Sequence, residues 1–165
     1  MIEPRVAENP PARFILCERR DHWAVSLARS VPSIRAMLYE TRSIPQAWDA
    51  LCLSPASFLG LELTENNFEG VVRGLKHLSR DYPRARAIIF ANRALQHYEW
   101  ILRESGAIDF LVSPRRIQQL AAMADCHIRL AQTDSQIGDQ TIWQRLPWRP
   151  RHDTNEPTRV HNTDC

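Results

Sequence analysis

Short apolar runs alternate with longer amphipathic segments, and the alternation repeats five times along the chain. Apolar runs bounded by polar segments are typical of strands buried on both faces of a sheet. The apolar runs are residues 13–18, 34–40, 57–63, 85–91 and 107–113, and the segments with helical periodicity are residues 21–31, 43–53, 67–82, 94–106 and 115–132. This repeat predicts an α/β fold built on a doubly wound parallel sheet. We expect the strand order 2-1-3-4-5 of a flavodoxin-like sandwich.

Local signals support several of these boundaries. Ser43 followed by Pro45 is typical of a helix start, and Asp21 can cap the helix that follows it. Gly106 closes the fourth helical segment.

The 165 residues suffice for one domain, which we place at residues 13–132. Residues 1–12 hold three prolines and are expected to form a flexible arm. Residues 133–165 are polar and lack a sustained period, so we expect a mostly disordered tail. Residues 142–148, IWQRLPW, are the exception, and could dock on the domain or on a partner.

The charge balance gives no indication of a polyionic partner. There are 21 basic and 19 acidic residues, so the net charge of +2 gives no general attraction to nucleic acid or to a membrane. No apolar run is long enough to span a bilayer and the N-terminus does not resemble a signal peptide, so we expect a cytoplasmic protein. The histidines and cysteines show no metal-ligand spacing, and we expect neither metal nor cofactor.

Acidic residues end two of the apolar runs. Glu18 follows the first run, and Glu62 ends the third within FLGLELTENNFEG, residues 58–70. The carboxyl ends of parallel strands meet at one edge of a sheet, next to the point where the strand order reverses. Any site is therefore expected at the edge that holds Glu18 and Glu62.

The segment LELTENNFEG resembles the third-strand motif of response-regulator receiver domains, and the resemblance extends over about residues 12–132. Glu62 falls on that family's phospho-accepting Asp, and Gly70 falls on its Gly. Ala91 falls on the family's Thr or Ser, and Ser113 on its Lys, followed by Pro114. Phe110 falls on the aromatic residue that reports switching in that family.

The departures from the family pattern imply a degenerate member, a pseudo-receiver. Receivers hold magnesium with two acidic residues after the first strand and with the acceptor, but here Glu18 is followed by Arg19. The lysine and hydroxyl that contact the phosphoryl group are replaced by Ser113 and Ala91. The resemblance therefore implies a CheY-like fold without phosphorylation chemistry or enzymatic activity. Glu62 is either a fixed mimic of a charged acceptor or, as we favour, the partner of a nearby arginine.

Arginines follow four of the five predicted strands. They are Arg19, Arg20, Arg42, Arg93, Arg115 and Arg116. They could be solvated or locally paired, which is the simpler interpretation, or they could bind a small anion or a phosphate-containing ligand. A ligand binder or enzyme that uses this rim is the competing functional class.

The resemblance also implies a partner surface on the fourth helix, the fifth strand and the fifth helix. Tyr98, Trp100 and Met123 belong to these segments and are residue types enriched at interfaces, although they also occur in cores. We expect a protein partner or a homodimer on this face, in signal transduction or regulation.

Overall fold

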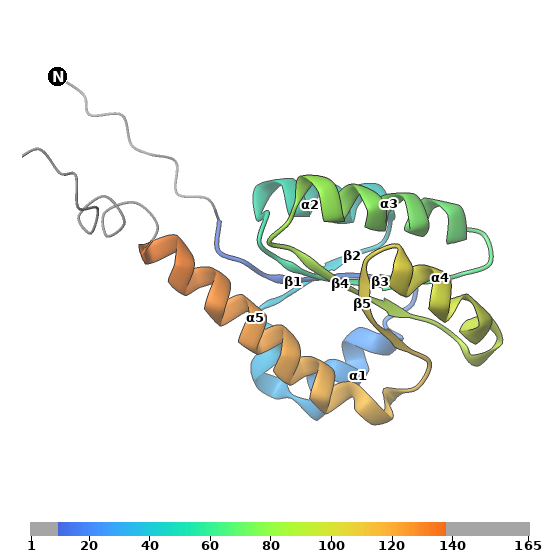
Figure 1. Ribbon diagram of the computed structural model, residues 1–165. Coiled ribbons are helices and arrows are strands. Elements are labelled where there is room, and N and C mark those ends of the chain that lie inside the picture. The colour runs from blue at the N-terminus through green and yellow to red at the C-terminus, as the bar shows by residue number, and fades with distance from the viewer. Residues whose placement is uncertain (1–9, 138–165) are drawn as a thin grey trace, which may run out of the picture.

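The computed structural model describes residues 10–137 and is built on a five-stranded parallel sheet (Figure 1). The strand order is β2-β1-β3-β4-β5, as the sequence predicts. The strands are β1 (Phe14–Cys17), β2 (Leu38–Thr41), β3 (Phe58–Glu62), β4 (Arg86–Phe90) and β5 (Ala107–Leu111).

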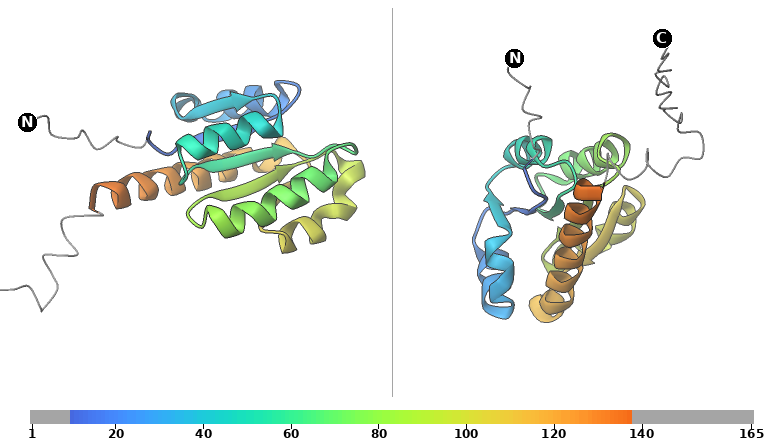
Figure 2. Two further views of the ribbon diagram at one scale, coloured as in Figure 1. Left: turned by 90° about the horizontal axis from the view of Figure 1, so that it is seen from above. Right: turned by 90° about the vertical axis from the view of Figure 1, so that its left-hand side faces the viewer.

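Helices cover both faces of the sheet (Figure 2). α2 (Ile44–Leu53), α3 (Phe68–Asp81) and α4 (Glu99–Glu104) contribute to one buried cluster, and α1 (His22–Ser30) and α5 (Ile117–Ile137) contribute to the other. No helix within residues 10–137 combines the length and the apolar character that crossing a lipid bilayer requires.

Strand β1 illustrates why the apolar runs form central strands. All four of its residues are buried. Ile15 and Cys17 join the cluster beneath α2 and α3, whereas Phe14 and Leu16 join the cluster beneath α1 and α5. Because successive side chains point to opposite faces, a strand covered on both sides must be apolar throughout.

The strand register brings the predicted site to one edge. Cys17 lies beside Leu61 and Thr41, and Glu62 lies beside Phe90. The residues that follow β1, β2, β3 and β4 therefore meet at the carboxyl edge of the sheet.

Three predicted elements differ in extent. Residues 34–40 were expected to be a strand, but Pro32–Ala36 form a 3-10 helix (η1), because Pro32 occupies its first turn, and β2 begins only at Leu38. The predicted helix over 94–106 is split into a 3-10 helix (η2, Arg93–Tyr98) and α4, which is followed by Gly106 at a φ of 116°.

The fifth helix also differs from its predicted bounds. It is preceded by a 3-10 turn (η3, Pro114–Arg116), and α5 continues to Ile137 rather than ending at residue 132. Most of the expected arm and most of the expected tail, including residues 142–148, lie outside the described residues.

Candidate functional site at the carboxyl edge

Both carboxylate oxygens of Glu18 are occupied by the start of α1. The backbone amides of Trp23 and Ala24 donate to Glu18 Oε2 and Oε1 at 2.9 and 2.8 Å. Glu18 is only 1% exposed. It therefore provides the helix cap that we predicted for Asp21, whose side chain makes no capping hydrogen bond.

The environment of Glu18 has opposing effects on its charge. Burial raises the pKa of the Glu18 carboxyl, and the amide hydrogen bonds from Trp23 and Ala24 offset part of that rise. Asp21 instead forms an ion pair with Arg42, which also lies 3.6 Å from Glu40. The acidic residues around β1 are thus used to cap a helix and to pair with an arginine.

In the described part of the chain, Glu62 accepts a hydrogen bond from a backbone amide and not from an arginine side chain. The amide of Arg19 donates to Glu62 Oε2 at 2.7 Å. Within residues 10–137 no ion pair joins Glu62 to a guanidinium group, which corrects our expectation that an arginine side chain would pair with it. The contact instead joins the loop after β1 to the end of β3.

Asn67 fixes the loop that follows Glu62. Its side-chain amide donates to the Glu62 carbonyl at 2.8 Å, and its carbonyl oxygen accepts from the Thr64 amide at 2.8 Å. Leu63 continues the pairing with β4 through a 2.7 Å bond to the Phe90 carbonyl. These bonds hold Glu62 and its loop in one arrangement at the edge.

The residues present do not fit the magnesium site that the resemblance implies. One acidic position is occupied by Arg19, and both oxygens of Glu18 are engaged by amides. No group of three or more His, Cys, Asp or Glu side chains within residues 10–137 could hold a metal ion. Within that range Glu62 therefore does not belong to a cluster with the number of carboxylates that receivers use to hold magnesium.

The other positions that the resemblance singles out take part in the packing and hydrogen bonding of the fold. Ala91 is buried, and its amide donates to the Leu111 carbonyl at 2.9 Å. Ser113 precedes η3 and accepts a hydrogen bond from the Arg115 amide at 3.4 Å. Phe110 is buried in the cluster beneath α2, α3 and α4.

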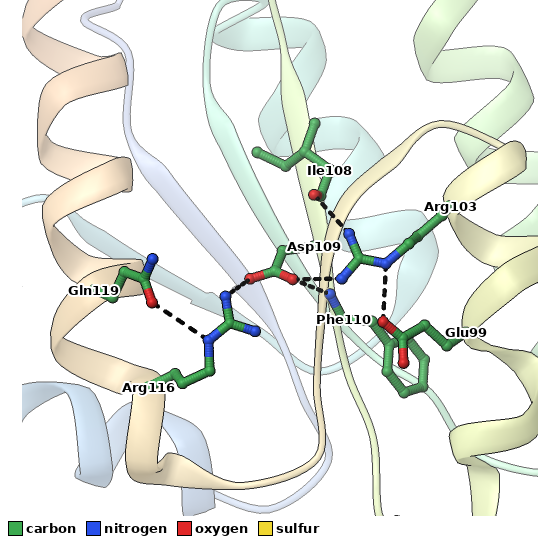
Figure 3. Close-up of polar contacts among 7 residues, drawn as sticks. All are labelled: Glu99, Arg103, Ile108, Asp109, Phe110, Arg116 and Gln119. Atoms are coloured by element: carbon green, nitrogen blue, oxygen red, sulfur yellow. Dashed lines mark hydrogen bonds and ion pairs between the residues drawn. The ribbon is translucent and has the colours of Figure 1, made fainter.

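The six rim arginines do not form one site. Arg42 is paired with Asp21 and Glu40, whereas Arg116 binds Asp109 and Gln119 (Figure 3). The side chains of Arg19, Arg20, Arg93 and Arg115 form no ion pair within the described part of the chain. Arg20 and Arg93 line a surface hollow of about 660 Å³ that also contains Glu62 and Glu65.

A buried carboxylate that we did not predict joins α4, β5 and η3 (Figure 3). Asp109 lies 2.7 Å from Arg103 and 3.0 Å from Arg116, and its side chain is 9% exposed. Arg103 also binds Glu99 at 2.9 Å and the Ile108 carbonyl at 3.1 Å. The sequence signal was the single acidic residue inside the apolar run 107–113.

The pairing of β5 explains where Asp109 points. Ala107 pairs with Ala87, but Asp109 pairs with Ile88, so the register shifts by one residue at Ile108. Because Ile88 belongs to the cluster beneath α1 and α5, the shift places Asp109 on the same face as η3 and α5. Arg116 can then reach it from η3, and Arg103 reaches it from α4 across the sheet edge.

The three predicted interface residues have different environments. Trp100 on α4 is 69% exposed. Tyr98 is half-buried and packs against the core, with its ring 4.3 Å from that of Phe68. Met123 on α5 is half-buried. Ile101 and Ile108 are further exposed apolar residues of α4 and β5 that the sequence did not single out.

Comparisons with known proteins connect this fold to receiver domains. No protein-family model and no curated protein matches the sequence. A CheY-like protein (tadZ) from Pseudomonas aeruginosa PAO1 matches with a TM-score of 0.57 and 15% identity, over 70% of this chain and 98% of that one. The signal receiver domain of a protein assigned as a Luxo repressor, from Vibrio parahaemolyticus, matches with a TM-score of 0.59 and 18% identity, over 79% and 99% of the two chains.

A third solved structure is described as an atypical orphan response regulator with a phosphorylation-independent regulatory mechanism. It matches with a TM-score of 0.54 and 15% identity, over 71% of this chain and 95% of that one. At these identities the likeness concerns the fold, and the described part of the chain has the fold of CheY-like receiver domains.

Proposed function

We propose that the chain is a phosphorylation-incompetent pseudo-receiver that acts, without catalysis, as a protein–protein interaction module in cytoplasmic signal transduction or regulation. The observation that supports it most is the use of Glu18 as a helix cap, because both of its oxygens are directed at backbone amides of α1 and Arg19 occupies the second acidic position of a receiver. The solved structure described as phosphorylation-independent shares this fold.

The proposed docking surface is the face of α4, β5 and α5. Asp109, whose side chain is nearly buried, binds Arg103 of α4 and Arg116 of η3, and Arg116 also binds Gln119 of α5, so these contacts connect the elements of the face (Figure 3). Trp100, Ile101 and Ile108 are exposed on α4 and β5. Exposed tryptophan is a common centre of binding energy at interfaces. The occupant is a second copy of the chain or another protein.

The test is self-association of the full chain, measured by light scattering over a concentration series. We expect concentration-dependent dimers, lost in Trp100→Ser and retained in Leu53→Ser. Leu53 is a matched control because it is 64% exposed but lies on α2. Monomers at every concentration would exclude the homodimer, and equal losses in both variants would contradict the assignment of this face.

A competing candidate is the binding of a small anion at the hollow beside Glu62. Arg20 and Arg93 line that hollow without ion pairs in the described residues, and the buried hydroxyl of Thr64 there has no hydrogen-bond partner. Glu62 and Glu65 line the same hollow and oppose an anion. Thermal unfolding with inorganic phosphate separates the candidates, since binding would raise the unfolding temperature of the wild type but not of Arg93→Ala.

A further inference from the structure

The exposed side of α3 carries a stripe of four basic side chains, Arg73, Lys76, His77 and Arg80. Their spacing of three, four and seven residues places them on one face of the helix. Together with Trp48 of α2 and with Gly70 and Gly74 of α3, they line a surface hollow of about 600 Å³. We call this hollow the α2–α3 groove, after the two helices that lie on the same face of the sheet in Figure 1.

Two glycines give the groove its depth. A Cβ at Gly74 would lie 2.6 Å from the indole ring of Trp48, so the ring packs directly onto the backbone of α3. A Cβ at Gly70 would meet only Ile44 Cδ1, at 3.8 Å, so the space above Gly70 is open. The groove is therefore lined by the Trp48 ring on one side and by exposed backbone of α3 on the other.

The charges that line the groove are all basic. Asp81 neutralises its far end, at 2.7 Å from His77 and 2.8 Å from Arg80. Arg73 and Lys76 form no ion pair within residues 10–137, and both are exposed. Two cations that have no ion pair in the described part of the chain thus line the same hollow as the indole ring of Trp48.

We propose that the α2–α3 groove binds an acidic polypeptide segment, with carboxylates on Arg73 and Lys76 and one apolar side chain against Trp48. The stripe is about 10 Å long from its first to its last residue, the length of about three residues of extended chain. Nucleic-acid binding relies on phosphate contacts spread over a larger basic surface, and the chain's net charge is only +2. The site is distinct from the face of α4, β5 and α5, so its partner adds to the proposed function.

The test uses the full chain and a fluorescein-labelled peptide with one phenylalanine among glutamates. Fluorescence anisotropy reports binding. Two further peptides replace the glutamates by lysine or the phenylalanine by alanine, and an oligonucleotide of the same charge represents the other class of polyanion. We expect the first peptide to bind most tightly of the four.

Double charge-reversal variants test whether the peptide binds at the α2–α3 groove. Arg73→Glu combined with Lys76→Glu is expected to weaken binding of the peptide at least about tenfold. The matched control combines Arg29→Glu with Arg35→Glu, two exposed basic residues beside a hollow at α1, across the sheet. It changes the net charge equally and is expected to alter affinity by less than about twofold.

Gly70→Leu tests the groove without altering charge. The larger side chain would fill the open space, and leucine favours a helix more than glycine does, so the fold should remain intact while peptide binding falls about tenfold. Thermal unfolding verifies that each variant is folded. The proposal is overturned if the control reversal weakens binding as much as the groove reversal, if the oligonucleotide binds more tightly, or if the peptide does not bind.

Discussion

Glu18 is a strand-end carboxylate whose role is determined by the helix that follows it. In sequence it resembles half of an acidic metal pocket, but the start of α1 directs two amides at its oxygens. The unpaired amides of a helix start favour an anion, and a buried carboxylate needs donors. One residue therefore satisfies both requirements.

Replacing Glu18 by Ala is expected to lower the free energy of unfolding by about 1–2 kcal/mol, because two buried amides lose their acceptor. The substitution also removes a buried charge, which is itself unfavourable, and this offsets part of the lost stability. Urea unfolding measures the change. Asp21→Ala is the control, with an expected loss below about 1 kcal/mol because its pair with Arg42 is exposed. A larger loss for Asp21→Ala would contradict the assignment of the cap.

His127 is expected to make the stability of the folded chain depend on pH. Burial lowers the pKa of His127, with a further contribution from the charges of Arg86 and Arg84, while a hydrogen bond to the Ala56 carbonyl at 2.9 Å opposes the shift. The unfolded chain, in which a histidine has a pKa of about 6.5, then binds a proton at a higher pH than the folded chain. This contribution to stability is complete above about pH 6.5 and is lost as the pH falls through the window below it.

The measurement compares wild type with His127→Gln, whose side-chain amide can still donate to Ala56. We expect the wild type to lose more stability than the variant between about pH 7 and pH 5, as followed by urea unfolding. Parallel pH profiles of the two proteins would show that His127 does not titrate differently in the folded state.

Among the elements, the edge strand β5 is held by side-chain contacts as well as by its pairing with β4. An edge strand leaves backbone groups unpaired, and Arg103 occupies one of them by donating to the Ile108 carbonyl at 3.1 Å. Asp109 then connects Arg103 to Arg116, so that α4 and η3 are joined through the same carboxylate.

Asp109→Asn is expected to lower the free energy of unfolding by about 1–2 kcal/mol, because a nearly buried carboxylate loses its charge while both arginines keep theirs. The arginines are partly exposed, which limits the loss. Asp125→Asn is the matched control, since it breaks an exposed pair with Arg129 on α5 and should cost below about 0.5 kcal/mol. Similar losses in both variants would show that the Asp109 contacts add nothing beyond a surface pair.

The predictability of each element follows from its burial. The four residues of β1 are all buried, so an apolar run was sufficient to identify the strand. The edge strand β2 is half-exposed, and its run was indistinguishable from the 3-10 turn of Pro32–Ala36 before it. The split between η2 and α4 depends on local hydrogen bonding that apolar periodicity does not specify.

For the whole molecule, the strand order and the position of the carboxyl edge of the sheet could be predicted. The hydrogen-bond and ion-pair partners of the side chains at that edge could not. Parallel pairing alone places Glu18, Glu62 and Ala91 together. Whether Glu62 binds a guanidinium group or the Arg19 amide depends on loop geometry, and Asp109 reaches Arg116 because of a one-residue register shift. Neither feature has a signature in spacing or composition.

The fold also separates the two proposed surfaces. The α2–α3 groove lies across α2 and α3, whereas Trp100 lies on α4 next to the edge strand. The two surfaces share no residue, so under both proposals the chain would join two proteins through different side chains.

The most direct test of the central claim is the response of the full chain to magnesium and acetyl phosphate, measured by intact-protein mass spectrometry beside a competent receiver. The account predicts no phosphoryl adduct on the wild type. It also predicts none on Glu62→Asp, since Arg19, Ala91 and Ser113 remain in place. A stoichiometric, magnesium-dependent adduct on Glu62 of the wild type would contradict the account.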